Sequence, residues 1–283
     1  MKFNIACIQN CATDNLSQTI QDCEVLSREA YDAGADLICL PEFFSYLNLN
    51  EKGLDVAPFR ESEHPTLAAF QELSLKLQVW ILLGSIAIYD SQGKKRNRSI
   101  LLNPRGEIEV RYDKIHMFDV NLPNGEVYRE SDVFSPGNKA VTASLPWGEL
   151  GLTVCYDLRF PHLYRSLAHA GADVISVPAA FTRTTGQAHW HVMLRSRAIE
   201  TGAYVVAPCQ YGDHGRAKTY GHSLIIDPWG RILADGGEDR GYIIAEVDME
   251  EVKNARRMIP ALEHDRDYTK PNLELPQTLR KVS

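Results

Sequence analysis

The stretch Gly151–Pro161, GLTVCYDLRFP, constrains the fold of this chain more than any other segment. Residues 152–154 are apolar or β-branched, which is typical of the end of a buried strand. Asp157 can then cap a helix, because the apolar side chains that follow it recur at helical spacing. Cys155 is therefore predicted to lie at a sharp strand-to-helix turn, at the C-terminal edge of an α/β sheet.

The predicted position of Cys155 has two chemical consequences. A thiol near a helix N-terminus has its thiolate form favoured by the helix dipole. The free backbone N–H groups of the first helical turn can bind a developing oxyanion. A single buried cysteine is nevertheless more often an inert core residue than a nucleophile, so the rest of the chain must decide between these interpretations.

The composition restricts the class of protein. With 283 residues, 44% of them hydrophobic, the chain can form one large α/β domain. A net charge of −7 without a basic stripe argues against nucleic acid as a partner. No apolar stretch is long enough to cross a bilayer, and no signal-peptide pattern precedes the first strand. The cysteines show neither a CxxC pair nor metal-ligand spacing: Cys7, Cys11, Cys23, Cys39, Cys155 and Cys209. We therefore expect a cytoplasmic protein with reduced thiols, no membrane association and no metal or other cofactor.

Hydrophobic periodicity predicts strands and helices along the whole chain. Strands are expected at 3–9, 36–40, 79–89, 97–103, 107–112, 139–145, 149–154, 173–177, 204–207, 222–226, 231–234 and 242–247, and helices at 15–33, 64–77 and 187–201 as well as after Asp157. The motif AGAD joins a helix to a strand at 33–36 and again at 170–173, which indicates two related halves. Residues 113–138 are expected to form a long irregular loop. No linker divides the chain, so one domain is predicted for residues 1–283, with a polar C-terminal arm from about residue 259 suited to contact with a neighbouring subunit.

Two further residues have side chains suited to catalysis. Glu42 follows the apolar strand and Pro41, a position that suits a general base and equally a helix cap. Lys114 follows the strand that ends at Tyr112, where a solvated loop lysine is the simpler interpretation. Neither residue identifies a site when it is considered alone.

Together, however, three short motifs resemble a known family. LPEFF, YDKIHMF and VCYDLRFP, in this order, resemble the nitrilase superfamily of carbon–nitrogen hydrolases, and the resemblance extends over nearly the whole chain to YGHSLIIDPWG. The stretches AFTRTTGQAHWHVMLRSRAIE and YGHS…DPWG are most similar to the branch whose members act as deaminated glutathione amidases. The resemblance implies a four-layer α-β-β-α sandwich that commonly assembles into homodimers or larger homo-oligomers.

The resemblance also implies a catalytic triad of Glu42, Lys114 and Cys155. In this interpretation Glu42 takes the thiol proton and later activates water. Lys114 and the backbone N–H of Tyr156 stabilise the oxyanion. The family's second glutamate matches Glu130 in RESDVFSPG, and its implied role is to position the substrate amide and to orient the lysine.

Substrate-binding residues are predicted near the nucleophile. Arg159 lies about one helical turn beyond it, where a guanidinium can hold a substrate carboxylate through two hydrogen bonds. An ion pair with Asp157 is the alternative interpretation. By resemblance, Phe181 and Thr185 line the substrate pocket, with ordinary loop packing as the alternative.

Other titratable residues receive a structural interpretation. Glu126, beside Asn124-Gly125, is expected to be a solvated turn residue. His189 and His191 are two positions apart on a predicted helix and cannot face one ligand. No histidine has a partner at metal-ligand spacing; this also holds for His116, His162 and His222.

The predicted function is hydrolysis of a small carboxylate-bearing amide through a cysteine acyl-enzyme, with release of ammonia. Deaminated glutathione is the favoured substrate, and an omega-amidase acting on alpha-ketoglutaramate or an N-carbamoyl amidohydrolase is the alternative. True nitrilases fit less well, because their C-W-E is replaced by Cys155-Tyr156-Asp157. A catalytically silent binding or scaffold homologue is the alternative from another class, and the intact Glu42, Lys114 and Cys155 argue against it.

Overall fold

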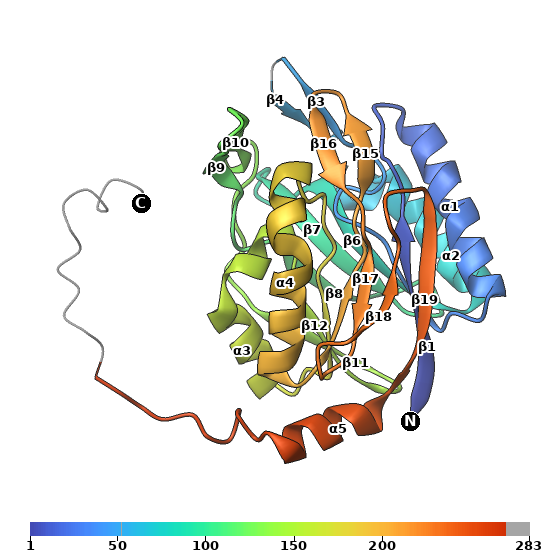
Figure 1. The fold of residues 1–283 in the computed structure, drawn as a ribbon. Coiled ribbons are helices and arrows are strands. Elements are labelled where there is room, and N and C mark those ends of the chain that lie inside the picture. The colour runs from blue at the N-terminus through green and yellow to red at the C-terminus, as the bar shows by residue number, and fades with distance from the viewer. Residues whose placement is uncertain (52, 270–283) are drawn as a thin grey trace.

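Two large β-sheets pack face to face in the computed structural model, which describes residues 1–51 and 53–269 (Figure 1). The first sheet has the strand order β19 (Gly241–Asp248), β1 (Lys2–Gln9), β2 (Leu37–Cys39), β6 (Trp80–Tyr89), β7 (Lys95–Leu102) and β8 (Ile108–Asp113), and β5 (Phe59–Arg60) also pairs with β6. The second has the order β11 (Val141–Leu145), β12 (Gly148–Leu152), β13 (Val174–Ser176), β14 (Tyr204–Ala207), β17 (Leu224–Ile226) and β18 (Ile232–Asp235). The central strands β1, β2 and β6, and likewise β12, β13 and β14, are parallel.

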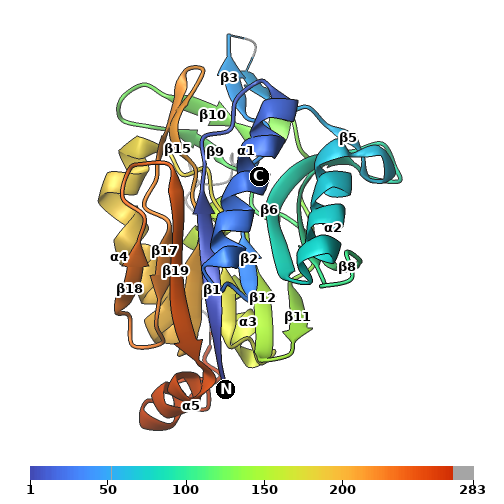
Figure 2. The same cartoon turned by 90° about the vertical axis from the view of Figure 1, so that its right-hand side faces the viewer.

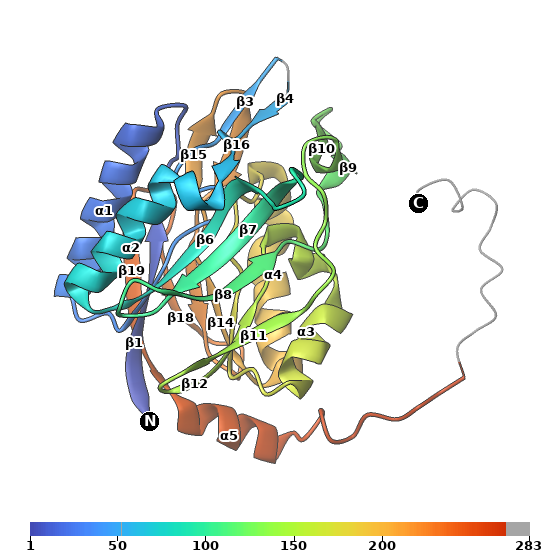
Figure 3. The ribbon, with the colours of Figure 1, turned by 180° about the vertical axis from the view of Figure 1, so that it is seen from behind.

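Helices cover the outer face of each sheet. α1 (Leu16–Asp32), which is capped by the side chain of Asn15, and α2 (Pro65–Leu77) lie on the first sheet (Figure 2). α3 (Pro161–His169) and α4 (Arg183–Thr201) cover the second sheet on the opposite side (Figure 1). The predicted four-layer α-β-β-α sandwich is therefore confirmed. α5 (Met249–Met258) lies beside the N-terminus at one end of the sandwich (Figure 3).

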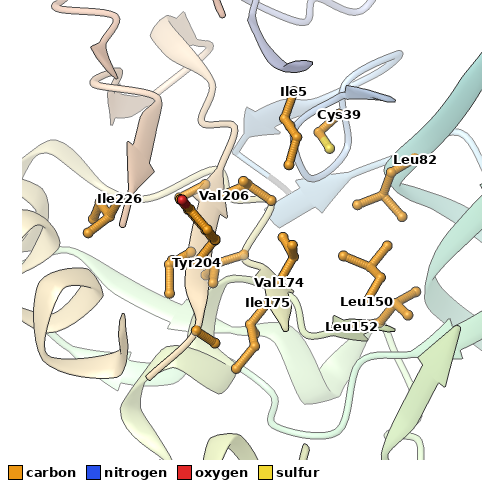
Figure 4. Packing of buried hydrophobic residues seen from close by; sticks show 14 of the residues in the cluster. Ile5, Cys39, Leu82, Leu150, Leu152, Val174, Ile175, Tyr204, Val206 and Ile226 are labelled. Atoms are coloured by element: carbon orange, nitrogen blue, oxygen red, sulfur yellow. The ribbon is translucent and has the colours of Figure 1, made fainter. Parts of the chain in front are cut away.

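Apolar side chains from both sheets fill the space between them. The first sheet contributes Ile5, Cys39 and Leu82, and the second contributes Leu150, Leu152 and Val174 (Figure 4). The other face of β2 packs against α1 and α2. Burial on both faces explains why the sequence of β2 is apolar without alternation.

The AGAD motif has the same structural role in both halves. Gly34 and Gly171 follow α1 and α3 with left-handed φ angles of 95° and 97°, a conformation that favours glycine. Asp36 and Asp173 each accept a hydrogen bond from a backbone N–H on the neighbouring parallel strand, at 2.8 and 3.1 Å. The two halves therefore repeat one βαβ arrangement, as the sequence motif indicated.

The segment after Cys155 differs from the prediction. Residues Cys155–Arg159 form a short 3₁₀ turn, and α3 begins only at Pro161, with Phe160 as its N-cap residue. Proline is favoured at the first position of a helix because the missing N–H has no acceptor there. Asp157 therefore does not cap an α-helix, and the five-residue turn carries less dipole than the predicted helix.

Three short hairpins occupy segments in which no strands were predicted. They are formed by β3 (Asn48–Asn50) with β4 (Gly53–Asp55), β9 (Asp119–Asn121) with β10 (Val127–Arg129), and β15 (Tyr211–His214) with β16 (Ala217–Tyr220). All three stand at the same end of the sandwich (Figure 1). Residues 113–138 are therefore more regular than expected, and the hairpins form a rim above the sheets.

The predicted C-terminal arm lies partly outside the described residues, which end at 269. Its described part, 259–269, contains no helix or strand, and Asp265 contacts His169 of α3 at 2.6 Å. The contact of the arm with a neighbouring subunit stays a prediction, as does the single domain over 1–283. Across residues 1–51 and 53–269, no helix is long and apolar enough to cross a membrane.

Candidate active site

A thiol, an amine and two carboxylates lie close together at the end of the sandwich that carries the three hairpins. Glu42 lies three residues after β2, Lys114 directly follows β8, and Cys155 lies three residues after β12. Glu130 begins a short 3₁₀ turn after β10. The side chains of Lys114, Glu42 and Glu130 are only 2, 3 and 5% exposed. Four residues from four separate segments thus form one buried cluster.

The carboxylate of Glu42 is held on both oxygens. Its Oε1 accepts hydrogen bonds from Lys114 Nζ and Asn97 Nδ2, both at 2.9 Å. Its Oε2 accepts from the backbone N–H of Ala180 at 3.0 Å. These donors fix the plane of the carboxylate close to the thiol of Cys155, with which Glu42 also forms a hydrogen bond.

The backbone around Glu42 is strained and is held in place by hydrogen bonds with two distant side chains. Phe43 has a left-handed φ of 51°, which is unusual for a bulky side chain. The side-chain amide of Gln210 donates to the carbonyl oxygens of Glu42 and Phe43 at 2.8 and 3.0 Å. The N–H of Phe43 donates to Ser85 Oγ at 3.1 Å. Gln210 and Ser85 therefore hold the turn that aims Glu42, and sequence analysis predicted neither.

Lys114 lies between the two glutamates. Its Nζ donates to Glu42 Oε1 at 2.9 Å and to Glu130 Oε2 at 2.7 Å. Burial works against the charge of this amine, but Glu130 and Glu42 outweigh it and hold the pKa of Lys114 well above its ordinary value. Burial also raises the pKa of Glu130, against the effect of the lysine. Lys114 is therefore a fixed cation at the base of the site.

Asn97 links the two carboxylates and was also missed in the sequence. Its Nδ2 donates to Glu42 Oε1 at 2.9 Å and to Glu130 Oε1 at 3.0 Å. Its carbonyl oxygen accepts from the backbone N–H of Lys114 at 2.9 Å. The sequence offered little signal, because Asn97 is the first residue of the predicted strand 97–103, whereas the structure places it inside β7.

Cys155 occupies a strained position, and its surroundings raise the pKa of its thiol. Its φ angle is 49°, and its backbone N–H donates to the carbonyl of Pro178 at 2.9 Å. Burial and the negative charge of Glu42 raise the pKa of the thiol well above its ordinary value, although Lys114 acts in the opposite direction. The predicted stabilisation of the thiolate by a helix dipole is therefore wrong here. Burial and the neighbouring carboxylate outweigh the weak field of a five-residue turn.

The protonation state of Cys155 can be measured directly. A raised pKa means less thiolate than an ordinary cysteine carries at any given pH. We therefore expect the ultraviolet thiolate absorbance of the wild type, after subtraction of the Cys155→Ala spectrum, to stay flat between about pH 5 and 8. The subtraction removes the signal of the five other cysteines. A titration step near neutral pH would indicate a thiolate ion pair and contradict this description.

Asp157 organises the turn around Cys155 instead of capping a helix. Its side chain is fully buried and accepts hydrogen bonds from the Tyr112 hydroxyl at 2.6 Å, the Val154 N–H at 2.9 Å and the His116 N–H at 3.1 Å. These bonds join the end of β8 to the turn after β12. Asp157 thereby fixes the relative positions of the segments that carry the lysine and the cysteine.

A cavity of about 390 Å³ opens from the buried cluster toward the three hairpins. Apolar and aromatic side chains make up much of its wall, including Phe118, Tyr156 and Phe181. Exposed charged residues line its outer part, which we call the mouth: the cations Arg129, Arg216 and Lys218 and the acids Glu51 and Asp132. The volume suits a small molecule, and the charged groups at the mouth suit a ligand with a charge remote from the cluster.

The residues predicted to bind substrate separate into two groups. Tyr156, Phe181 and Thr185 line the cavity. Arg159 is not among the described residues that line it: its guanidinium lies 5.9 and 5.8 Å from the ring centroids of Tyr156 and Phe181 and contacts His189 Nδ1 at 3.2 Å. The 3₁₀ turn directs this side chain differently from the predicted helix. In this structure Arg159 supports two aromatic walls of the cavity.

The four-layer sandwich and its enclosed thiol, amine and carboxylates define a class of hydrolases that act on carbon–nitrogen bonds. The carbon–nitrogen hydrolase family model matches residues 4–257, and the chain belongs to this family. The predicted membership of the nitrilase superfamily is thereby confirmed.

Individual relatives of this chain carry names that are more specific than the family. The deaminated glutathione amidase of Synechocystis sp. (strain PCC 6803 / GT-S) is 43% identical over 92% of this chain and 96% of its own length. The deaminated glutathione amidase of Homo sapiens is 36% identical over 96% of this chain and 85% of its own. The crystal structure of the C. elegans NitFhit protein is similar with a TM-score of 0.84 and 31% identity, over 94% of this chain and 65% of that longer one. This chain thus spans just under two thirds of the NitFhit protein.

Proposed function

We propose that this chain hydrolyses deaminated glutathione, with Cys155 as the nucleophile. The observation that carries the proposal is a cavity with the thiol cluster at its base and Arg129, Arg216 and Lys218 at its mouth. Deaminated glutathione has a carboxylate at each end, so one carboxylate can reach the cationic mouth while the amide lies at the thiol. The activity named for relatives at 43 and 36% identity supports the same substrate.

Acylation starts from the neutral thiol. Glu42 accepts the proton of Cys155 as the sulfur attacks the amide carbonyl carbon, so that no free thiolate is needed at rest. The carbonyl π electrons move to oxygen. The oxyanion is stabilised by Lys114 Nζ and by the N–H of Tyr156, which directly follows the nucleophile. The carbon–nitrogen bond then breaks, and Glu42 returns the proton to the leaving nitrogen. A thioester remains on the cysteine.

Deacylation uses the same base. Glu42 takes a proton from a water molecule that attacks the thioester carbonyl, and the second tetrahedral intermediate forms in the same oxyanion site. Its collapse breaks the carbon–sulfur bond, and the sulfur recovers the proton from Glu42. Glu130 keeps Lys114 charged and oriented throughout, through the 2.7 Å hydrogen bond to its Nζ.

The released group depends on the substrate. Deaminated glutathione contains only secondary amides, so its hydrolysis at the former glutamyl amide releases cysteinylglycine and 2-oxoglutarate. The predicted release of ammonia therefore applies only to primary amides such as alpha-ketoglutaramate. An assay that detects ammonia alone would miss the proposed reaction.

A substrate panel tests the proposal. We expect kcat/KM for deaminated glutathione to exceed that for alpha-ketoglutaramate, succinamate, an N-carbamoyl amino acid and a simple nitrile. Arg216→Gln should lower kcat/KM for deaminated glutathione by about tenfold or more, which is the scale of a hydrogen bond to a charged group. The same change should have little effect on alpha-ketoglutaramate, which lacks the glycine carboxylate on the leaving-group side of the amide. Arg183→Gln is the matched control, because this exposed arginine pairs with Glu238 and does not line the cavity.

The alternatives predict different results from the same panel. A higher kcat/KM for alpha-ketoglutaramate would replace the proposed activity by that of an omega-amidase. Equal losses on both substrates in Arg216→Gln would refute its contact with the remote carboxylate. A folded protein without activity on any compound would support the silent homologue.

We further propose a cytoplasmic location and a homodimer or larger homo-oligomer. All six cysteines are free thiols, which suits a reducing compartment. Large apolar side chains are exposed on and beside the outer helices, including Val192 and Ile199 of α4 and Met258 and Ile259 at the end of α5. Burial of such side chains commonly drives assembly of identical subunits.

A further inference from the structure

We infer that His191, His222 and Asp235 form a binding site for one divalent transition-metal ion of the Zn²⁺ type. They come from α4, from the segment between β16 and β17, and from the end of β18. His191 Nε2 lies 3.1 Å from Asp235 Oδ2, and His222 Nδ1 lies 2.9 Å from Asp235 Oδ1. A ligand atom from each of the three residues lies within 4.8 Å of the other two.

The chemistry of the three donors favours such an ion. Two imidazole nitrogens and one carboxylate oxygen are ligands that Zn²⁺ and its neighbours in the transition series prefer. Ligands about 2.0–2.2 Å from a tetrahedral ion lie about 3.3 Å from one another, and the two histidine–aspartate distances of 3.1 and 2.9 Å are close to this value. Side chains that are 21–35% exposed leave access for the ion and for a water molecule as fourth ligand.

Neighbouring residues hold the side chains of His222 and Asp235 in place. His222 has a left-handed φ of 52°. Its backbone N–H donates a hydrogen bond to the carbonyl of Gly237. Its carbonyl oxygen accepts a hydrogen bond from the indole N–H of Trp190 at 2.8 Å. The ring of Tyr220 stacks on the His222 imidazole at 4.5 Å. The N–H of Gly237 also donates to Asp235 Oδ1 at 2.9 Å.

The carboxylate of Asp235 offers one oxygen to each histidine. Its Oδ2 lies toward His191 and its Oδ1 toward His222. Without an ion, the two imidazoles can donate their protons to this carboxylate. A bound metal would take the place of these protons on the ligating nitrogens, and each neutral ring would carry its proton on its other nitrogen.

An ion at this position would join three elements near the cavity. α4 carries Thr185, and the β15–β16 hairpin carries Arg216 and Lys218, all of which line the cavity. His222 follows this hairpin directly. Metal binding would therefore fix the base of the hairpin against α4 without contributing to the chemistry at Cys155. This inference does not depend on the identity of the substrate.

Zn²⁺ titration of the chelator-stripped full chain tests the site. In competition with a chromophoric chelator, we expect one equivalent of Zn²⁺ to bind. His191→Asn and Asp235→Asn should each weaken its affinity by about tenfold or more. Saturating Zn²⁺ should raise the thermal midpoint of the wild type by several degrees and leave that of both variants nearly unchanged. His169→Asn is the matched control. His169 also pairs with an exposed aspartate, Asp265, but within residues 1–51 and 53–269 it belongs to no group of three possible metal ligands.

Three outcomes would overturn the inference. The wild type could show no saturable Zn²⁺ binding, or the His191 and Asp235 variants could bind as tightly as the wild type. The binding could also disappear after alkylation of the thiols with iodoacetamide, which would assign the ion to a cysteine. Unchanged binding after alkylation, together with loss in both variants, supports the histidine–aspartate site.

Discussion

Cys155→Ala is expected to abolish amide hydrolysis, with kcat reduced by about 10⁴-fold or more. The substitution removes the only sulfur in the cluster of Glu42, Lys114 and Glu130, so no covalent intermediate can form. The protein should remain folded, because only one sulfur atom is lost at the base of the cavity and alanine keeps the same backbone. Steady-state kinetics and the thermal midpoint measure the two effects separately.

Two further experiments complete this test: a control substitution at another cysteine and detection of the acyl-enzyme. Cys11 is half-buried and does not belong to the cluster, so Cys11→Ala should retain nearly full activity. Mass spectrometry of the wild type during slow turnover should find the acyl group on Cys155. Substantial turnover by pure Cys155→Ala, or an acyl group on another cysteine, would reject the assignment of the nucleophile.

Glu130→Gln is expected to lower kcat by about a hundredfold or more, the scale of one preorganised electrostatic contact. The side chain keeps its shape but loses the charge that helps to hold Lys114 protonated. Because Glu130 raises the pKa of Lys114, its removal should lower that pKa. The remaining activity should therefore decline at a lower pH on the alkaline side than that of the wild type. A pH profile of kcat checks this shift.

Glu126→Gln is the control for position. Glu126 contacts Asn124 and the Tyr128 hydroxyl and makes no hydrogen bond with Lys114. We expect its kcat to stay within about twofold of the wild type, as for other surface substitutions. If Glu126→Gln were the damaging change and Glu130→Gln the silent one, the second glutamate would have been assigned to the wrong residue.

Much of the fold could be predicted from the sequence because its signals are local. The apolar run before Glu42 and the alternation of helical and strand patterns identified the central strands and the helices that cover them. Both AGAD motifs marked the junction of a helix and a strand, and the structure has such a junction at each of them. The order of the three motifs pointed to Glu42, Lys114 and Cys155, which the structure brings together.

The error at Asp157 has an equally local cause. An aspartate before an apolar helical pattern normally indicates a cap, but Pro161 set the start of α3 four residues later. Arg159 lies in this 3₁₀ turn and not on a helix, and its contact with a substrate carboxylate stays a prediction. Sequence periodicity alone could not distinguish a 3₁₀ turn from the first turn of an α-helix.

Tertiary structure alone decided which distant residues meet. Asn97 bridges Glu42 and Glu130 across separations of 55 and 33 residues, and Gln210 clamps the turn after β2 from 168 residues away. His191, His222 and Asp235 likewise converge from three elements, although their spacing suggested no ligand set. The sequence determined where the strands end and which side chains follow each strand. Strand order, burial and loop closure determined which of those side chains share a site, and the resulting desolvation and charge determined the pKa of the Cys155 thiol.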